Sequence, residues 1–250
     1  MKNRLRETWA AGKPAVNGWL SVPSTVTAEI SGMADFDSLL IDVQHGLVDY
    51  QMALTMMQAL SGSDATPLAR VPWNEPGIIM KLLDAGALGI VCPMINTRAD
   101  AEKFVGACTY APDGYRSSGP TRAGMIHADY HNQANANIVS MAMVETVEAL
   151  ENVDEIATTP GLTGIYVGPS DLAISMGFQP GLDRKEPEMV AAIDKILSAC
   201  KNAGIVPGLH CMTPAYAKQM FANGFRFATL ASDVRIFTAG VNAIVAEARS

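Results

Sequence analysis

The sequence is poor in charged residues and in long apolar stretches. Only 17% of its 250 residues are charged, no block of like charge appears, and the net charge is -7. Nucleic acids and anionic membranes are bound through a surplus of lysine and arginine, so neither is expected as a partner. The longest apolar stretch, residues 86–95, is about half as long as a membrane-spanning helix.

Cysteine is also scarce and scattered. Cys92, Cys108, Cys200 and Cys211 form no C-x-x-C pair, and we expect them to be reduced and mostly buried thiols. Residues 1–13 are charged and contain no apolar signal core. These features predict a cytoplasmic protein. An apolar fraction of 49% leaves surface for contacts between subunits.

Short apolar runs alternate with helical patterns along the whole chain. Several runs are nearly continuous in apolar residues, which is typical of parallel strands covered on both faces. Eight such runs with helices between them match a single (β/α)8 TIM barrel over residues 1–250, and a doubly wound sheet is the alternative. The runs cover residues 17–22, 38–43, 66–71, 89–93, 138–144, 164–167, 205–209 and 225–230.

One segment, residues 116–137, does not follow this alternation. It is rich in Gly, Ser and Asn, so we expect a lid or a binding loop unless the segment contains a short helix. His127 and His131 lie four residues apart in it, a spacing that can bind a metal on a helix. Because the Glu of a metalloprotease motif is absent, a lid or surface role is expected for both histidines.

In a (β/α)8 barrel the chemistry is found where the strands end. The second run ends at Asp42 and His45, and a carboxylate three residues from an imidazole can accept its ring N–H; a capped loop is the alternative. The third run ends at Arg70, which suits a carboxylate or a developing oxyanion unless it forms a salt bridge that closes the barrel. His210 follows the seventh run and either lines the pocket or has a structural role.

Two acids follow neighbouring strands, Glu145 after the fifth run and Asp171 after the sixth. Such strands are about 5 Å apart, and carboxylates that close repel each other unless a cation lies between them. A hard divalent ion satisfies both and leaves coordination positions for a chelating substrate. The Gly168-Pro169-Ser170 turn would offer N–H groups to an anion. Starting or capping a helix are the alternative roles of the two acids.

A Schiff-base mechanism would instead need a lysine at a strand end. None of the eight lysines falls at such a position, and the sequence contains no Walker A motif. Metal-assisted chemistry is therefore favoured. The lysines are Lys2, Lys13, Lys81, Lys103, Lys185, Lys195, Lys201 and Lys218.

Across nearly its whole length the sequence resembles the HpcH/HpaI family of class II pyruvate aldolases. The resemblance rests on the order and spacing of several segments that are each modest alone. The segments are Gly18-Trp19-Leu20, Ile41-Asp42-Val43-Gln44-His45-Gly46, Leu82-Leu83-Asp84-Ala85-Gly86-Ala87, Pro93-Met94, Met143-Val144-Glu145-Thr146 and Gly168-Pro169-Ser170-Asp171-Leu172.

The resemblance implies a metal-dependent aldolase in which Glu145 and Asp171 bind a divalent ion, either Mg, Mn, Co or Zn. It implies that Arg70 contacts the keto oxygen and that His45 and Asp42 form the acid/base pair. The implied reaction joins the enolate of pyruvate or hydroxypyruvate reversibly to an aldehyde.

The resemblance also implies a last helix exchanged between subunits, a hexamer built as a trimer of dimers, and an Asp84 that approaches the neighbouring subunit's site. The sequence departs from the family at Met143, where Gln is frequent, at Gln44, where Glu is frequent, and in the loop 113–119, which lacks the usual Arg-Gly-x-Gly form. We expect these departures to change substrate preference more than the class of reaction.

Two other functions stay open. A malyl- or citramalyl-CoA-type lyase of the same superfamily would need a basic patch for the coenzyme A phosphates, and the sequence shows none. A non-catalytic ligand-binding protein on the same scaffold would have no need for intact Asp42, His45, Arg70, Glu145 and Asp171. Metal-dependent exchange of pyruvate protons separates the aldolase from both.

Overall fold

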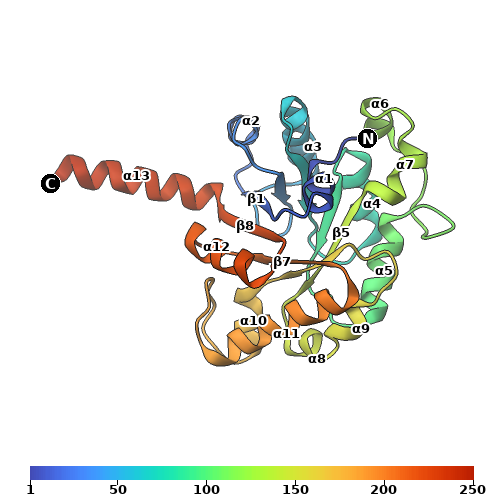
Figure 1. Ribbon diagram of the computed structural model, residues 1–250. Helices are drawn as coiled ribbons and strands as arrows, with labels where there is room; N and C mark the ends of the chain where they lie inside the picture. The colour runs from blue at the N-terminus through green and yellow to red at the C-terminus, as the bar shows by residue number, and fades with distance from the viewer.

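The computed structural model describes residues 1–250, apart from the side chain of Ala231, and its strands form one closed barrel. Every strand is parallel to its neighbours and pairs with the next strand of the chain, until β8 closes the barrel against β1. Helices surround this barrel (Figure 1). The strands are β1 (Ala15–Leu20), β2 (Ser38–Asp42), β3 (Thr66–Arg70), β4 (Gly89–Cys92), β5 (Val139–Val144), β6 (Gly164–Val167), β7 (Val206–His210) and β8 (Phe227–Ser232).

The barrel forms from these segments because their residues are apolar on both faces. Every residue of β2, β4, β5 and β6 is buried, as parallel strands covered by helices require. One apolar layer lies between strands and helices, and a second fills the barrel interior. The interior layer includes Trp19, Leu40, Leu68, Val91, Met141, Tyr166 and Phe227.

Most of the helices follow a strand and cover the barrel from outside. Several begin at a side chain that accepts a main-chain N–H, and α5 has a full capping box formed by Thr97 and Asp100. The helices are α1 (Arg4–Ala10), α2 (Thr25–Gly32), α3 (Tyr50–Ala59), η1 (Leu60–Gly62), α4 (Pro76–Asp84), α5 (Arg98–Cys108), α6 (Thr121–Ile126), α7 (Tyr130–Asn137), α8 (Val147–Glu151), α9 (Val153–Ala157), α10 (Pro169–Ser175), α11 (Pro187–Ala203), α12 (Pro214–Asn223) and α13 (Asp233–Arg249).

All eight predicted strands are present, and their observed ends differ from the predicted ones by two residues at most. The segment 116–137 differs from the expected lid, because it contains α6 and α7 and packs at the opposite end of the barrel. Arg122 of α6 donates hydrogen bonds to the carbonyl of Ala85 and the hydroxyl of Ser61, which precede β4 and β3. The alternative of a hidden short helix is therefore confirmed.

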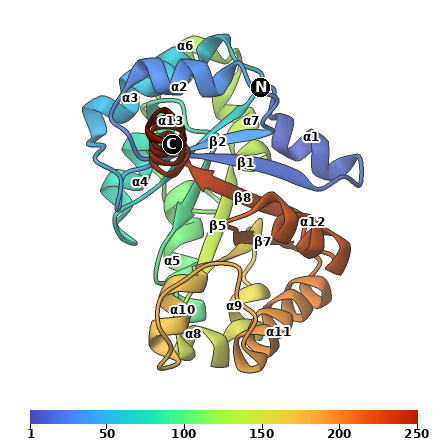
Figure 2. The ribbon, with the colours of Figure 1, turned by 90° about the vertical axis from the view of Figure 1, so that its left-hand side faces the viewer.

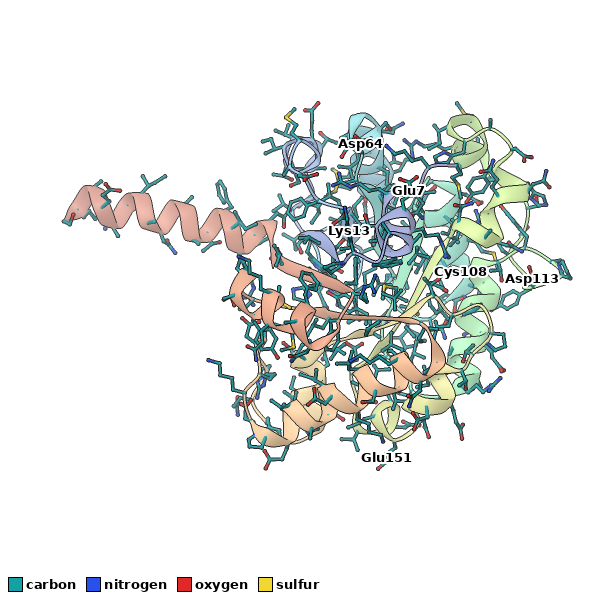
Figure 3. All side chains as sticks on the ribbon, in the orientation of Figure 1. Glu7, Lys13, Asp64, Cys108, Asp113 and Glu151 are labelled. Carbon is teal, nitrogen blue, oxygen red and sulfur yellow. The ribbon has the colours of Figure 1, made fainter. Side chains whose placement is uncertain are left out.

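The last helix, α13, has a different relation to the barrel from the others. It extends away from the barrel wall as a single helix (Figures 1 and 2). None of its 17 residues is buried, and its side chains stand clear of the rest of the chain along most of its length (Figure 3). Neither α13 nor any other helix of the described residues is long and apolar enough to cross a membrane.

Candidate active site

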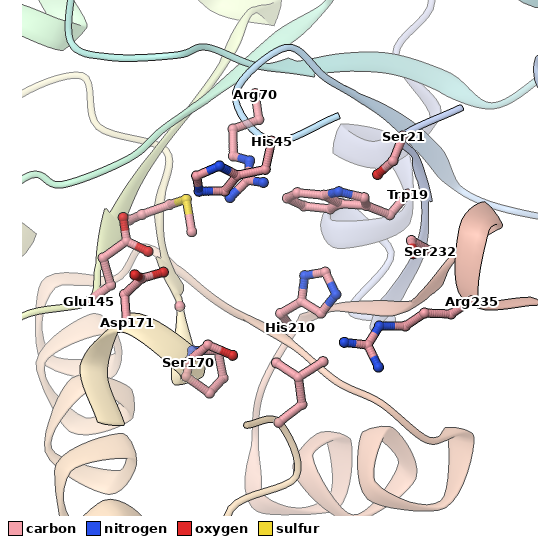
Figure 4. Close-up of a pocket in the computed structure, with 14 residues that line it drawn as sticks. Trp19, Ser21, His45, Arg70, Glu145, Ser170, Asp171, His210, Ser232 and Arg235 are labelled. Carbon is pink, nitrogen blue, oxygen red and sulfur yellow. The ribbon is translucent and has the colours of Figure 1, made fainter. Parts of the chain in front are cut away.

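The candidate active site is a pocket at the C-terminal ends of the strands. Its cavity volume is about 310 Å³, which suits a small keto acid and a small aldehyde. Eight of the ten predicted site residues line it, and Asp42 and Asp84 do not (Figure 4). The eight are His45, Arg70, Glu145, Gly168, Pro169, Ser170, Asp171 and His210.

Asp42 is buried and fixes the side chain of Arg70, which lines the pocket. Its carboxylate accepts hydrogen bonds from Arg70 Nε at 2.8 Å and Nη2 at 2.6 Å, and from Trp19 Nε1 at 3.2 Å. Burial would raise the pKa of Asp42, but the hydrogen bonds and charge of Arg70 outweigh it and lower the pKa. The ion pair offered as an alternative for Arg70 is therefore present, and the same guanidinium also lines the pocket.

The expected bond between Asp42 and the ring of His45 is replaced by bonds to the main chain. Asp42 Oδ1 accepts the backbone N–H groups of Gln44 at 3.1 Å and His45 at 3.2 Å. A spacing of two to three residues lets an aspartate close such a turn on its own backbone. With Arg70 and Trp19 bound as well, Asp42 makes no hydrogen bond to the His45 ring among the described residues. The imidazole of His45 lines the pocket separately.

Glu145 and Asp171 bring two carboxylates to one side of the pocket (Figure 4). Glu145 directly follows β5 and Asp171 lies in the first turn of α10, after β6, and β5 pairs with β6 as far as Val144 and Val167. Glu145 is only 2% exposed, and its Oε1 accepts the backbone N–H of Met94 at 2.8 Å. Burial, with a further contribution from the charge of Asp171, raises the pKa of Glu145 to about 7.

Gly168 makes room for this carboxylate. A Cβ atom at Gly168 would stand 2.2 Å from Oε2 of Glu145, so only glycine permits the observed position. Glu145 is thus held near the carboxylate of Asp171, where a bound cation would stabilise both negative charges. The described residues contain no group of three or more His, Cys, Asp or Glu side chains that could hold a metal. Two carboxylates fit a hard divalent ion whose other ligands are water and substrate.

The turn from β6 into α10 offers fewer free amides than its sequence indicates. The N–H of Gly168 points to the carbonyl of Val144 at 3.4 Å, and Pro169 has no N–H. The amides of Ser170 and Asp171 in the first turn of α10 are the ones left for an anion.

His210 is fixed by a buried chain of hydrogen bonds. Its Nδ1 lies 3.1 Å from the hydroxyl of Tyr166, which donates its own proton to Thr229 Oγ1 at 2.6 Å. The Tyr166 oxygen therefore accepts from Nδ1–H, which leaves Nε2 of His210 as an acceptor. Burial, aided by the charges of Arg70 and Arg235, lowers the pKa of His210 to about 4, so the ring is neutral at pH 7.

Asp84 lies outside the pocket of its own chain. It accepts a 2.6 Å hydrogen bond from Nη2 of the buried Arg116, whose guanidinium stacks on the rings of Tyr110 and Tyr130. The unusual loop at 113–119 thus supplies a buried partner for Asp84 within the same chain.

The two histidines of segment 116–137 also lie outside the pocket. The ring of His127 stacks on Tyr130 and the ring of His131 contacts Tyr110, with ring centroids 6.1 Å and 4.4 Å apart. No lid over the strand ends is formed by these residues.

Six further residues line the pocket that are not among the predicted site residues. Trp19 lies in β1 and Ser21 directly follows it, Ser232 ends β8, and Arg235 lies in the first turn of α13. Met143, one of the departures from the family pattern, lies near the end of β5. Trp19 and Ser21 lie within the first predicted run, and Ser232 and Arg235 follow the eighth within five residues, so their positions at strand ends are the signal that the sequence offers. Leu182 comes from the loop between α10 and α11 and carries no signal in the sequence.

The chain is similar over nearly its whole length to known proteins. Residues 18–239 match the family model described as "HpcH/HpaI aldolase/citrate lyase". A protein of Rhizorhabdus wittichii named "Hydroxypyruvate/pyruvate aldolase" is 40% identical over 249 residues, which are 99% of both chains. A "4-hydroxy-2-oxo-heptane-1,7-dioate aldolase" of Salmonella dublin is 33% identical, over 98% of this chain and 94% of that protein.

A solved structure gives the same result for the fold. The crystal structure of an HpcH/HpaI aldolase/citrate lyase family protein from Burkholderia cenocepacia superimposes with a TM-score of 0.93 at 31% sequence identity, and the match covers all of both chains. With the family model matching most of its length, this chain belongs to the HpcH/HpaI aldolase/citrate lyase family.

Proposed function

We propose that this protein is a class II pyruvate aldolase, an aldehyde-lyase. It joins the enolate of a pyruvate-like 2-keto acid reversibly to an aldehyde and so forms a 4-hydroxy-2-keto acid. The observation that carries the proposal is the paired carboxylates of Glu145 and Asp171, which share one pocket with Arg70 and His45. The relatives named as aldolases, at 33% and 40% identity over nearly the full chain, support it.

Glu145 and Asp171 would hold the divalent ion, and their oxygen ligands suit Mg or Mn best among Mg, Mn, Co and Zn. A bound ion supplies Lewis-acid stabilisation to the keto acid. Glycine at position 168 keeps the space that the Glu145 carboxylate needs for this task.

Arg70 stabilises the negative charge that develops on the keto oxygen. Its Nε and Nη2 are bonded to Asp42, which fixes the plane of the guanidinium and leaves Nη1 as a donor to the substrate. Asp42 thus acts by orienting Arg70 and by ordering the turn that carries His45. A donor fixed before the substrate arrives needs no reorganisation during the reaction.

His45 acts as the base that removes the proton from carbon three of the keto acid. Its ring lines the pocket with Arg70, while its backbone is tied to Asp42. The free amides of Ser170 and Asp171 would bind the substrate carboxylate. His45 also manages the proton on the aldehyde-derived oxygen when the carbon–carbon bond forms or breaks.

The test is hydrogen-to-deuterium exchange at carbon three of pyruvate, followed by NMR in heavy water. We expect exchange by metal-stripped enzyme only after Mg²⁺ or Mn²⁺ is added. Glu145→Ala and Asp171→Ala should lose both exchange and Mn²⁺ binding, and Glu151→Ala, which removes an exposed acid of α8, should lose neither. No exchange by wild-type enzyme with the metal demonstrably bound would favour the CoA-ester lyase or the non-catalytic binding protein.

We also propose that α13 is exchanged between two subunits. The eighth helix of a (β/α)8 barrel lies beside the first, and here α2 exposes apolar side chains at that position while α13 extends away. A second copy of the chain, whose α13 covers this α2, buries both apolar surfaces. The exposed residues are Val26 and Ile30 on α2, Met33 at its C-cap, and Val234, Ile236, Phe237, Val241, Ile244 and Val245 on α13.

The remaining assignments follow from family membership. A hexamer built as a trimer of dimers, with Asp84 near the neighbouring subunit's site, is proposed on that basis. A cytoplasmic location is supported by the four cysteines, which are free and buried thiols.

A further inference from the structure

Arg235 lies at the end of the pocket opposite to the two carboxylates. Figure 4 shows its guanidinium beside His210, with Glu145 and Asp171 across the cavity. The pocket is therefore negative at one end and positive at the other. Because the keto acid occupies the negative end in the proposed function, the positive end receives the aldehyde.

The backbone that carries Arg235 is fixed to the barrel. Its neighbour Asp233 accepts the N–H groups of Ser21 at 2.9 Å and Val22 at 3.0 Å, which follow the end of β1. The first turn of α13 is thus held at the pocket of its own chain, although the rest of the helix extends away. Arg235 contributes to this pocket whether or not the distal part of α13 is exchanged.

The guanidinium of Arg235 has no acidic partner among the described residues. Its Nη1 contacts the sulfur of Met212 at 3.3 Å, and a thioether is a weak acceptor. The nearby carboxylate of Asp183 is occupied, since it accepts from the backbone N–H groups of Met212 and Thr213 and from the Thr213 hydroxyl. Most donors of Arg235 remain free for a ligand.

The surroundings of Arg235 also favour an anion. The hydroxyl residues Ser21 and Ser232 line the same end of the cavity, and no carboxylate of the described residues lines it there. A guanidinium binds a planar carboxylate through two parallel hydrogen bonds. The hydrogen bonds that Asp233 accepts from Ser21 and Val22 position Arg235 before the ligand arrives.

We propose that Arg235 selects the aldehyde substrate by binding a carboxylate at the end of the aldehyde remote from its carbonyl. The inference rests on the proposed binding of the keto acid at Glu145 and Asp171. Arg235 takes no part in the proton transfers. It is a specificity residue for the aldehyde and leaves enolate formation at the other end of the pocket unchanged.

The test compares two aldehydes with the same four-carbon chain, 4-oxobutanoate and its uncharged methyl ester, with pyruvate as donor and saturating Mn²⁺. For Arg235→Met we expect kcat/KM for 4-oxobutanoate to fall by about 10- to 100-fold, the usual loss for a charge-assisted hydrogen bond. The value for the methyl ester should change by about twofold at most. Arg235→Lys should retain part of the preference, because it keeps the charge and loses the bidentate geometry.

Two controls separate this inference from the proposed function. Arg249→Met removes a charge at the far end of the same helix and should leave kcat/KM unchanged for both aldehydes. Exchange at carbon three of pyruvate should be equal in Arg235→Met and wild type; absence of exchange in the wild type would count against the proposed function instead. An equal loss for both aldehydes, no loss for either, or impaired pyruvate exchange in Arg235→Met would each overturn the role of Arg235.

Discussion

Replacing Gly168 by alanine is the most direct test of how Glu145 is positioned. Gly168 precedes α10 with φ -98° and ψ 88°, a conformation outside the left-handed region, so alanine meets no left-handed strain there. The added methyl group would meet Glu145 instead. Its Cβ would lie 2.2 Å from Oε2 and 2.9 Å from the Cβ of Glu145. The substitution therefore acts on the proposed metal ligand without changing its chemistry.

The size of the effect follows from these distances. Real Cβ contacts are not shorter than 3.0 Å, so Oε2 must move by at least about 0.8 Å. Glu145 cannot follow freely, because Oε1 is bonded to the N–H of Met94 at 2.8 Å and the side chain is buried. We expect the affinity for Mn²⁺ to fall by about 10- to 100-fold, as for other changes that misplace a metal ligand. Pyruvate exchange should fall by about 100-fold, the usual cost of a displacement near 1 Å.

The assay is Mn²⁺ titration followed by electron paramagnetic resonance, with the exchange reaction measured in parallel. Gly77→Ala is the matched control, because a Cβ at Gly77 in α4 would meet no atom within 4 Å. Thermal unfolding of both variants checks that the barrel is intact. If Gly168→Ala binds Mn²⁺ as tightly as wild type and exchanges pyruvate at the same rate, Glu145 is not a metal ligand in the position described.

Two further predictions concern His210 and α13. Burial in the folded protein lowers the pKa of His210 from about 6.5 to about 4, so the folded protein binds this proton less readily than the unfolded chain. The folded state therefore loses stability as the pH falls from about 6.5 to about 4. The difference in free energy of unfolding between wild type and His210→Gln should shrink by about 3 kcal/mol between pH 7 and pH 4 in urea titrations; a constant difference would contradict the assignment. For α13, Phe237→Asp should give a smaller species in analytical ultracentrifugation, whereas Asn242→Asp, which adds the same charge to the same helix, should not; equal assemblies would refute helix exchange.

The fold was predictable because each strand is an apolar run and the longer helices between the strands have a helical periodicity. Local composition decides both, so the barrel and its strand ends follow from the sequence to within two residues. Segment 116–137 was harder, because α7 carries few apolar residues and only Tyr130 and Ala134 are buried in it. A short polar helix has little periodic signal, and its position at the far end of the barrel depends on tertiary contacts of Arg122.

The site was predictable to the extent that topology alone assembles it. Parallel strands end at one rim of a barrel, so residues that follow them meet there whatever lies between them in the sequence. Which groups then bond is a different matter. The three-residue spacing predicted a bond from Asp42 to the His45 ring, but Arg70 and Trp19 take the carboxylate, and the backbone takes the rest. Competition among donors is decided by distances that a sequence does not contain.

The interior of the barrel carries a polar chain that stability alone does not explain. Ser38 donates to Asn17 at 2.7 Å, Asn17 donates to Thr229 at 2.9 Å, and Tyr166 connects Thr229 to His210. Burying polar groups costs more free energy than packing apolar ones. Buried polar groups are therefore tolerated only when each of them is hydrogen-bonded. Of these five residues, only His210 lines the pocket. This series of hydrogen bonds therefore fixes one proton on Nδ1 of His210 and presents Nε2 as an acceptor. We infer that a function of Nε2 explains why four buried polar residues support His210.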